Sequence, residues 1–570
     1  MRLLAALALV LAASAAEAKD FCVNSSTGSD GTAYASLNMS TCAASVYRAT
    51  QVALAGDHVY VAAGTYTAAG TGNRFVSALN PANSGSSGSP IVFEAVGTVN
   101  LGLSSSTGPI VGCSARDYIT WIGFSVDEAS GTSEADTGST VGHDSTGCRF
   151  ESMTIDGNGT GHNRGDNHTG IRFEDCTDCY AGHNTIHDVY TCASGSCSFG
   201  DIAVNGHNGA CIQTYGSVNL TIEHNELYNC GAGIFIKGGP SGGWVADIDG
   251  HQIRYNLIHD VTLSGIAYYA GGPAASGTPS IISQNVVYAA TTCFRYWFFN
   301  STAQDPKNTH YINNTCYDAD YGFEYTGTPA AFSHNLKAWN NVISGVTNAV
   351  LSEQTTFHQS TAQNSHEHNV YHNVSGTMML LNGGGTSVTL ANWKLSPYTQ
   401  DAATPAAITT DPAFTNAAGA DFTLGGSSPA LSHGRVTESI GGSDGATIAA
   451  GAYITGSETI GPDAGGLTVP DAPTIGTATA GNAQCSVAFT PPGDDGGATI
   501  TGYTATSTPG SFTGTGASSP ITVTGLSNGT GYTFTVYATN SEGNSSASSA
   551  SNTCTPAAAA TRVRLRLRGQ

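Results

Sequence analysis

The middle of the chain alternates apolar and polar positions in short stretches, and this pattern repeats. Each repeat holds an asparagine followed by any residue, an apolar residue, usually His or Tyr, and often Asp or Asn. The last six copies lie 31, 29, 29, 27 and 28 residues apart, whereas the first step spans 41 residues. The repeated asparagines are Asn184, Asn225, Asn256, Asn285, Asn314, Asn341 and Asn369. A spacing this regular predicts a chain built of similar coils.

Short strand patterns lie between the repeated asparagines. Several begin with glycine and then alternate, as in residues 170–173, 233–236 and 265–268. About two strands per repeat, with no amphipathic stretch long enough for a helix, indicate an all-β solenoid. The amide of one asparagine can hydrogen bond to the asparagines above and below it, and asparagine tolerates left-handed backbone conformations. We therefore expect an asparagine ladder along the solenoid.

A different strand pattern begins near residue 469. Alternating stretches such as residues 485–489, 521–524 and 532–537 predict about seven strands in roughly 90 residues, which is typical of a β-sandwich. Residues 525–532 resemble the tyrosine corner of fibronectin type III domains. We therefore expect a fibronectin type III module here, and its sequence offers no catalytic cluster.

The charge of the chain and its N-terminal segment limit the classes of protein to which it can belong. The chain has 570 residues, 41 acidic and 19 basic, for a formal net charge of −22. No basic cluster precedes the last ten residues, which excludes nucleic-acid binding through a basic face. Arg2, an apolar stretch from Leu3 to Ala13 and a small-residue site ending at Ala18 are typical of a signal peptide. We expect a secreted or cell-surface monomer without a membrane span.

The 14 cysteines fit export, because oxidising compartments permit disulfides. Cys485 and Cys554 are placed to join the ends of the sandwich. The other expected pairs are Cys22–Cys42, Cys192–Cys197 and Cys293–Cys316. A CxxC at Cys176 and Cys179 is open to a redox, a zinc or a structural interpretation. No second CxxC or His pair completes a zinc set, so we favour a structural role.

The repeats resemble the right-handed parallel β-helix proteins of the pectate-lyase-like superfamily. Residues 55–66 and 88–93 look like opening coils, and residues 411–414 and 428–430 look like a closing segment. The resemblance covers about residues 20–455 and implies the fold, which hosts lyases, hydrolases, esterases, tailspikes and adhesins. The expected order is a signal peptide at 1–18, a right-handed parallel β-helix at 19–455, a linker at 456–468, the fibronectin type III β-sandwich at 469–557 and a basic tail at 558–570.

Lys237 stands out among the few lysines, because it alone ends a glycine-led repeat strand. If Ile234 and Ile236 point inward, a period of two places Phe235 and Lys237 on the outer face. Aligning the strands places Glu174, Thr214, Lys237, Tyr269 and Tyr296 in one outward row, and Arg172 and Phe235 in the adjacent row. The substrate-binding candidates are Arg172, Tyr215, Tyr269, Arg295 and Tyr296.

An amine, a carboxylate and aromatic rings in one row suit an acidic polysaccharide. β-Elimination of a uronate chain needs a base for the C5 proton, a neutralised carboxylate and a proton for the departing oxygen. The Lys237 motif resembles the single lysine of calcium-dependent lyases of this fold. That resemblance implies Lys237 as the base and Ca²⁺ as the group that neutralises the substrate. The candidate calcium ligands are Glu174, Asp175 and Asp178, or alternatively the polar loop of residues 156–167. Without such a cation, a charge of −22 would repel a polyanion.

The match to characterised lyases of the fold is incomplete. Alginate and dermatan lyases pair the lysine with an arginine one coil later, but residues 265–271 hold none, and Arg254 and Arg295 are the nearest substitutes. The clustered aspartates of pectate lyases are missing, as are the paired aspartates and Arg-x-Lys motif of polygalacturonases. His207, in the coil before Lys237, is open as a base, as a ligand or as a polar turn residue.

Two His–Asp pairs also admit two interpretations. His187–Asp188 and His259–Asp260 look like acid–base pairs in isolation, yet Tyr228–Asn229 occupies the same repeat positions, which favours a ladder of turn residues. The leading hypothesis is a secreted lyase acting on a uronate-containing polysaccharide. A non-catalytic glycan-binding adhesion protein and a β-helix glycoside hydrolase remain as alternatives.

Overall fold

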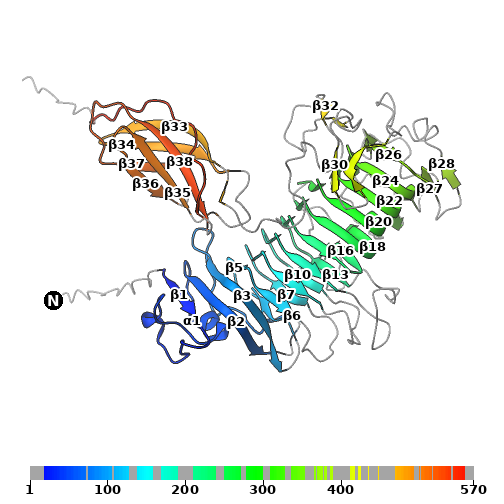
Figure 1. Ribbon diagram of the computed structural model, residues 1–570, viewed down its shortest axis with the longest axis horizontal. Helices are drawn as coiled ribbons and strands as arrows, with labels where there is room; N and C mark the ends of the chain where they lie inside the picture. Colours follow the sequence, from blue (N-terminus) through cyan, green and yellow to red (C-terminus); the bar gives the residue numbers. More distant parts are fainter. Residues whose placement is uncertain are drawn as a thin grey trace, which may run out of the picture. The chain divides into compact units, whose positions relative to one another are not determined.

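The computed structural model separates the chain into two compact units, Met1–Pro462 and Asp463–Gln570 (Figure 1). The described residues are 18–71, 73, 75–105, 108–127, 138–157, 169–189, 209–238, 250–270, 278–298, 309–327, 336–352, 365–367, 369–376, 378–381, 386–388, 411–417, 421–424, 434–435, 447–448, 469–470, 472–492, 500, 502–516, 518–540 and 543–558. The predicted signal peptide, His207, the Cys192–Cys197 pair, the linker and the basic tail lie outside these residues, apart from Ala18 and Ala558. Among the described helices, none is long and apolar enough to cross a membrane.

The first unit is a parallel β-solenoid, as the repeats predict. Its coils stack so that each strand pairs in parallel with the equivalent strand of the next coil. An N-terminal segment of β1 (Asp20–Val23), the short helix α1 (Val46–Val52), β2 (His58–Ala69) and β3 (Ile91–Ser105) opens the stack. The β29–β30 hairpin (Phe414–Asn416 and Asp421–Leu424) lies near its C-terminal end.

Three faces run along the described coils. Face 1 contains β7 (Gly138–His143), β10 (Thr169–Glu174), β13 (Ala210–Tyr215), β16 (Ala232–Lys237) and the later parts of β18 (Leu257–Ala270), β20 (Val286–Phe298), β22 (Thr315–Gly327) and β24 (Val342–Ser352). Face 2 contains β5 (Ile119–Ile122), β8 (Arg149–Glu151), β11 (Tyr180–Gly182), β14 (Thr221–Glu223), β17 (Gln252–Arg254), β19 (Ser280–Ser283), β21 (Thr309–Ile312), β23 (Leu336–Trp339) and β25 (Ser365–Glu367). Face 3 contains β6 (Ser125–Asp127), β9 (Thr154–Asp156), β12 (Thr185–His187), β15 (Glu226–Tyr228), the first parts of β18, β20, β22 and β24, and β26 (Val370–His372).

The solenoid core is built from alternate residues of these strands. On face 1, one inward row consists of Ile171, Ile212, Ile234, Ile266, Phe294 and Phe323, all at most 1% exposed. Two residues further along, Tyr268 and Tyr296 stack with their ring centroids 5.7 Å apart. Because each coil buries its apolar side chains against the next coil, hydrophobic burial holds the stack together.

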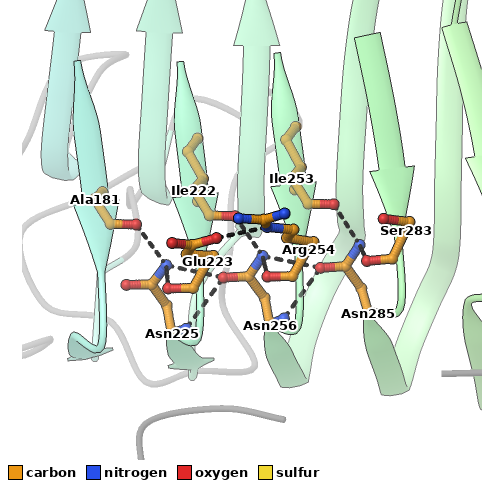
Figure 2. A network of polar contacts seen from close by, with 9 residues as sticks. All are labelled: Ala181, Ile222, Glu223, Asn225, Ile253, Arg254, Asn256, Ser283 and Asn285. Carbon is orange, nitrogen blue, oxygen red and sulfur yellow. Dashed lines mark hydrogen bonds and ion pairs between the residues drawn. The ribbon is translucent and has the colours of Figure 1, made fainter. Parts of the chain in front are cut away.

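The asparagine ladder is confirmed. All seven repeated asparagines are fully buried. Figure 2 shows three of them: Asn225 Nδ2 donates to Asn256 Oδ1 at 2.8 Å, and Asn256 Nδ2 donates to Asn285 Oδ1 at 2.9 Å. Each Oδ1 also accepts from the backbone N–H of the preceding ladder asparagine. The asparagine side chains thus supply hydrogen bonds to one another and to buried backbone N–H groups at the turn of each coil.

The left-handed backbone conformation falls beside the ladder and not on it. The residue before a ladder asparagine has a positive φ, as in His224 (54°) and Tyr255 (56°). A second positive φ closes the motif, as in Asn229 (52°), Asp260 (50°) and Gly345 (68°). This explains the preference for Asn, Asp and Gly at the last motif position, because these residues adopt that conformation at the lowest cost.

Five disulfides connect described cysteines. The predicted pairs Cys22–Cys42, Cys293–Cys316 and Cys485–Cys554 are confirmed. Two further pairs, Cys113–Cys148 and Cys211–Cys230, join neighbouring coils. Cys176 and Cys179 are unbridged and buried. Disulfides of this number are characteristic of proteins from oxidising compartments.

The second unit contains the predicted β-sandwich. One sheet consists of β33 (Thr474–Gly481), β34 (Gln484–Thr490) and β37 (Ile521–Thr524), and the other of β35 (Gly502–Thr508), β36 (Thr513–Gly516), β38 (Thr533–Asn540) and β39 (Gly543–Asn544). Tyr532 is 4% exposed, and its Oη accepts a hydrogen bond from the backbone N–H of Ser527 at 3.1 Å. This contact is the tyrosine corner that the sequence predicts.

Replacing Tyr532 by Phe is expected to lower the free energy of unfolding of the second unit by about 1 kcal/mol, because the backbone N–H of Ser527 then loses the Tyr532 hydroxyl as its acceptor. Scanning calorimetry of the whole chain measures the shift of that transition. Tyr537→Phe is the matched control, since Tyr537 is half-buried on the other side of the same strand. Equal shifts of the unfolding temperature in the two variants would argue against a stabilising role of the tyrosine corner.

Candidate functional site

Lys237 lies in an outward row on face 1. The strand register places Glu174, Tyr215, Lys237, Tyr269 and Trp297 opposite one another in successive coils. Neighbouring members are therefore about 4.8 Å apart along the solenoid. Lys237, Tyr269 and Trp297 are partly exposed, whereas Glu174 and Tyr215 are 1% and 5% exposed. The prediction of an outward Lys237 next to Tyr269 is confirmed.

Two predicted members of this row face the core instead. Thr214 is fully buried, and Tyr296 is 1% exposed in the hydrophobic core. For Tyr296 the reason is that Phe294 pairs with the inward residue Ile266. Side chains alternate along a strand, so Phe294 and Tyr296 both point inward on β20. The outward residue of that coil is consequently Trp297, which the sequence analysis missed. Aligning Phe294 with Ile266 as the inward apolar position would have found it.

A second outward row lies beside the first. It consists of Arg172, Gln213, Phe235, Ala267, Arg295 and Glu324. An ion pair lies at each end. Arg172 Nη2 is 2.8 Å from Glu174 Oε2, and Arg295 Nη2 is 2.6 Å from Glu324 Oε1. Arg172 is 2% exposed, while 16% of the Arg295 side chain is exposed. Arg295 is thus the predicted arginine that reaches the surface.

The Tyr215 ring lies between two cations. The Arg172 guanidinium carbon is 4.7 Å from the ring centroid, and Lys237 Nζ is 5.1 Å from it. Lys237 Nζ is also 5.5 Å from the centroid of Phe235. A cation near an aromatic face is attracted by the ring quadrupole. Tyr215 and Phe235 therefore fix where the Lys237 amine lies.

Aromatic side chains continue the row beyond Lys237. The Phe235 and Tyr269 centroids are 6.0 Å apart with nearly perpendicular rings, and the Tyr269 and Trp297 centroids are 4.9 Å apart. Burial raises the pKa of Tyr269, so its hydroxyl stays protonated at neutral pH. The partly exposed rings of Tyr269 and Trp297 offer apolar faces and hydroxyl and indole donors beside the amine.

The three predicted calcium ligands do not converge. The carboxylate of Glu174 is buried against Arg172. Asp175 and Asp178 are exposed in the turn after β10, and Asp178 Oδ1 accepts from Asn219 Nδ2 at 3.1 Å. Although Asp175 is exposed as a residue, partial desolvation of its carboxyl group raises its pKa, with His143 opposing this and Asp144 adding to it. Within the described ranges, the three side chains do not form a cluster of ligand atoms; Asp156, His187 and Asp188 do, with those atoms within 4.8 Å of one another.

The His–Asp pairs form part of a stacked ladder on face 3. His187 stacks on Tyr228, Tyr228 on His259 and His259 on Tyr288, with centroids 4.9–5.0 Å apart. Asp188 and Asp260 each hold the imidazole of the preceding residue at 2.7–2.8 Å. This arrangement favours the turn-ladder interpretation over separate acid–base sites. Arg254 lies on face 2 and pairs with Glu223 at 2.6 Å, so it does not substitute for a face 1 arginine.

The His259 pair predicts a pH-dependent contribution to stability. Burial lowers the pKa of His259, but hydrogen bonds to Glu226 and Asp260 outweigh it, and the net pKa is raised. A raised pKa stabilises the fold below about pH 6.5, the unfolded value, and this contribution disappears as the pH rises through the folded pKa. The loss in unfolding temperature caused by His259→Gln should therefore be larger at about pH 6 than at about pH 9. A pH-independent loss would contradict this.

A shallow depression lies elsewhere on the described surface. Val261, Ala290, Asp318, Asp320 and Thr347 are among its lining residues. The lining that the structure describes contains carboxylates but no basic or aromatic side chain. It therefore offers neither a base near neutral pH nor a stacking surface, and the face 1 row remains the stronger candidate.

Comparisons with known proteins address the two units separately. Residues 471–554 match the fibronectin type III domain family. No curated protein matches the chain. Two titin structures, one of them the titin kinase with its flanking domains, are 29% and 28% identical with TM-scores of 0.14; each match covers 15% of this chain and 31% or 17% of the titin chain. The chain thus spans less than a third of the length of these structures.

Solved structures of polysaccharide lyases match a larger share of the chain. The pectate lyase Pel9A is 14% identical, with a TM-score of 0.41 and coverage of 76% of this chain and 96% of that chain. The PL6 family polysaccharide lyase Pedsa3628 from Pseudopedobacter saltans is 13% identical, with a TM-score of 0.33 and coverage of 60% and 85%. The strand pairing of this chain shows a parallel β-solenoid, and the family match shows a C-terminal fibronectin type III domain.

Proposed function

We propose that the protein is a secreted polysaccharide lyase that cleaves a uronate-containing polymer by β-elimination, with Lys237 as the base. The observation that carries the proposal is the outward row on face 1. In it, a partly exposed amine lies between Tyr215 and Tyr269, and Trp297 follows one coil further. Such a row matches an extended chain of sugars lying along the coils, since aromatic rings stack on sugar faces and the amine meets one ring of the chain.

Lys237 would remove the C5 proton of a uronate. The C5 proton moves to Nζ, the electrons of the C–H bond form the C4=C5 double bond, the bond to O4 breaks, and the departing O4 takes a proton from water. A free lysine titrates near pH 10.4, so a lysine base requires a site at which the ammonium form is disfavoured. The protonated hydroxyl of Tyr269, in the next coil, is available to hydrogen bond to sugar oxygens.

Arg295 and Arg172 take different roles in this proposal. Arg295 is partly exposed beside Trp297, with its guanidinium carbon 5.9 Å from that ring. It is also paired with Glu324 through Nε and Nη2, so binding a uronate carboxylate would require it to share its guanidinium with Glu324. Arg172 is buried and contacts Tyr215 and Glu174, so it would position the Tyr215 ring against Lys237. Neutralising the carboxylate lowers the cost of forming the carbanion-like transition state.

Calcium is not assigned a step. A Ca²⁺ ion takes six to eight oxygen ligands, and Glu174, Asp175 and Asp178 do not converge on one point within the described part of the chain. Glu174 moreover already holds a guanidinium. These residues do not fit the ion that the resemblance implied. Chelation is nevertheless included in the assay, because it separates a metal-dependent reaction from one carried by side chains alone.

The test is a polymer screen with the purified full-length protein. Pectate, alginate and glycosaminoglycans are each incubated with the protein, with and without chelator, and the unsaturated product is followed by its ultraviolet absorbance. The proposal expects this product from at least one uronate polymer. New reducing ends without the absorbance would instead indicate a glycoside hydrolase.

A glycan-binding adhesion protein is the second candidate, favoured by the appended fibronectin type III domain. Modules of this kind commonly space or attach a neighbouring domain. Binding of a polymer without any cleavage product in the screen would select this candidate over the lyase.

A further inference from the structure

Two cysteines of the solenoid remain outside the disulfide set. Ten described cysteines form five bridges, whereas Cys176 and Cys179 are free and 1% exposed each. They lie in the turn between β10 and β11, directly after the Arg172–Glu174 ion pair. A dithiol is unusual in a chain whose other described cysteines are all oxidised.

The two thiols lie together. Cys179 is hydrogen bonded to Cys176 through their side chains. Both also contact Ser145 of the neighbouring coil: Cys176 Sγ is 3.3 Å from Ser145 Oγ, and Cys179 Sγ is 3.8 Å from Ser145 O. Asp175, directly before the Cys176–Cys179 segment, and Asp178, within it, have positive φ angles of 51° and 54°.

The surroundings do not fit a metal. Structural zinc takes four Cys or His ligands, and within the described residues neither cysteine belongs to a cluster of three or more ligating side chains. The zinc interpretation of the CxxC therefore has no support in this part of the chain. What remains is a pair of neighbouring sulfurs enclosed in the core.

We propose that Cys176 and Cys179 form a further intramolecular disulfide in the exported protein. Two S–H bonds break, one S–S bond forms, and two protons leave. The two electrons pass to a disulfide oxidant, either a small molecule or a protein, by thiol–disulfide exchange: one cysteine forms a mixed disulfide with the oxidant, and the other displaces the reduced carrier.

The timing of this oxidation follows from burial. Burial raises the pKa of the Cys179 thiol, with the neighbouring Cys176 adding to it, and the thiolate is the reactive form. Since both side chains are 1% exposed in the folded coil, the proposed oxidation would precede the closing of the coil over the turn. Once formed, the bridge is shielded from reductants in the folded protein.

The bridge would fix the turn from β10 on face 1 to β11 on face 2, which is hydrogen bonded to the next coil. The Asp175 N–H donates to Tyr215 O at 2.8 Å, and the Cys176 N–H donates to Ser217 Oγ at 3.1 Å. The same turn begins where Arg172 and Glu174 end β10. The inference does not depend on the proposed reaction, and it holds or fails whether or not the protein is a lyase.

The experiment is peptide mapping of full-length protein exported through an oxidising compartment. The protein is denatured in guanidinium with iodoacetamide and without reductant, digested, and analysed by mass spectrometry. We expect Cys176 and Cys179 to be unalkylated and joined in one peptide, and to become alkylated after reduction. Alkylation of both residues before reduction, with Cys113–Cys148 still intact, overturns the proposal, as does a bridge from either cysteine to another residue.

Single variants provide the matched readout. Cys179→Ser should expose one alkylatable thiol at Cys176, and Cys176→Ser one at Cys179, when each denatured protein is mapped without reductant. If both cysteines were already free in the wild type, the variants would instead lose one labelled thiol each. Mapping of the wild type decides the proposal even when a variant fails to fold.

Discussion

The Lys237→Ala variant is expected to form unsaturated product about a thousandfold more slowly than the wild type, on whichever uronate polymer the screen identifies. General-base groups contribute roughly 10²–10⁴ in rate, and no second lysine lies in the described part of the row. The side chain is partly exposed at the end of β16, so its removal leaves the core intact. Product formation is measured by ultraviolet absorbance at saturating polymer.

Two further variants separate basicity from charge. Lys337→Ala is the matched control, because Lys337 Nζ lies 4.5 Å from the Trp339 ring on face 2, in a similar amine–aromatic contact away from the row. Lys237→Arg retains the positive charge, but a guanidinium stays protonated and cannot act as the base. Activity retained by Lys237→Arg, or an equal loss in Lys337→Ala, would contradict the role given to Lys237.

Removing the amide of Asn256 is expected to destabilise the solenoid by about 3–5 kcal/mol, since several buried groups lose partners at once. Asn256 Oδ1 accepts from the backbone N–H and Nδ2 of Asn225, and its Nδ2 donates to Ile222 O, Arg254 O and Asn285 Oδ1 (Figure 2). Alanine has no side-chain amide, so these buried groups lose their hydrogen-bond partner. Chemical or thermal unfolding of Asn256→Ala measures the loss.

An exposed asparagine of the same unit is the control for this variant. Asn100→Ala replaces an exposed residue of β3 and should change stability by at most about 0.5 kcal/mol. Asn369→Ala, in the last coil of the ladder, should fall between the two, because Asn369 has ladder contacts with Asn341 on one side. Similar losses at Asn256 and Asn100 would show that the ladder contributes little.

The fold was predictable because its determinants are local and repeated. Each coil places an asparagine at the same turn, and a fully buried amide has few ways to be satisfied other than by its neighbours. The fibronectin type III domain was predictable for the same kind of reason, through Tyr532 and the Cys485–Cys554 pair. The extra bridges Cys113–Cys148 and Cys211–Cys230 were not, because sequence spacing does not reveal which coils stack.

The site was predictable only in part. The position of Lys237 follows from its own strand, where Ile234 and Ile236 define the inward side. Tyr296 was misplaced because aromatic residues occur on both sides of β20, and polarity alone does not distinguish Tyr296 from Trp297. The failure of the predicted carboxylates to converge was the least predictable feature. Glu174 is paired with Arg172, two residues away, and that pairing depends on the burial of both side chains.

The contacts between ladder asparagines do not depend on the number of residues between them. The 41-residue step from Asn184 to Asn225 ends in an amide contact of 2.8 Å, and the 29-residue step from Asn256 to Asn285 ends in one of 2.9 Å. The additional residues fall between β12 and β13 and leave the pairing of β10 with β13 unchanged. A longer connection between coils is thus compatible with an unchanged spacing of the outward side chains on face 1.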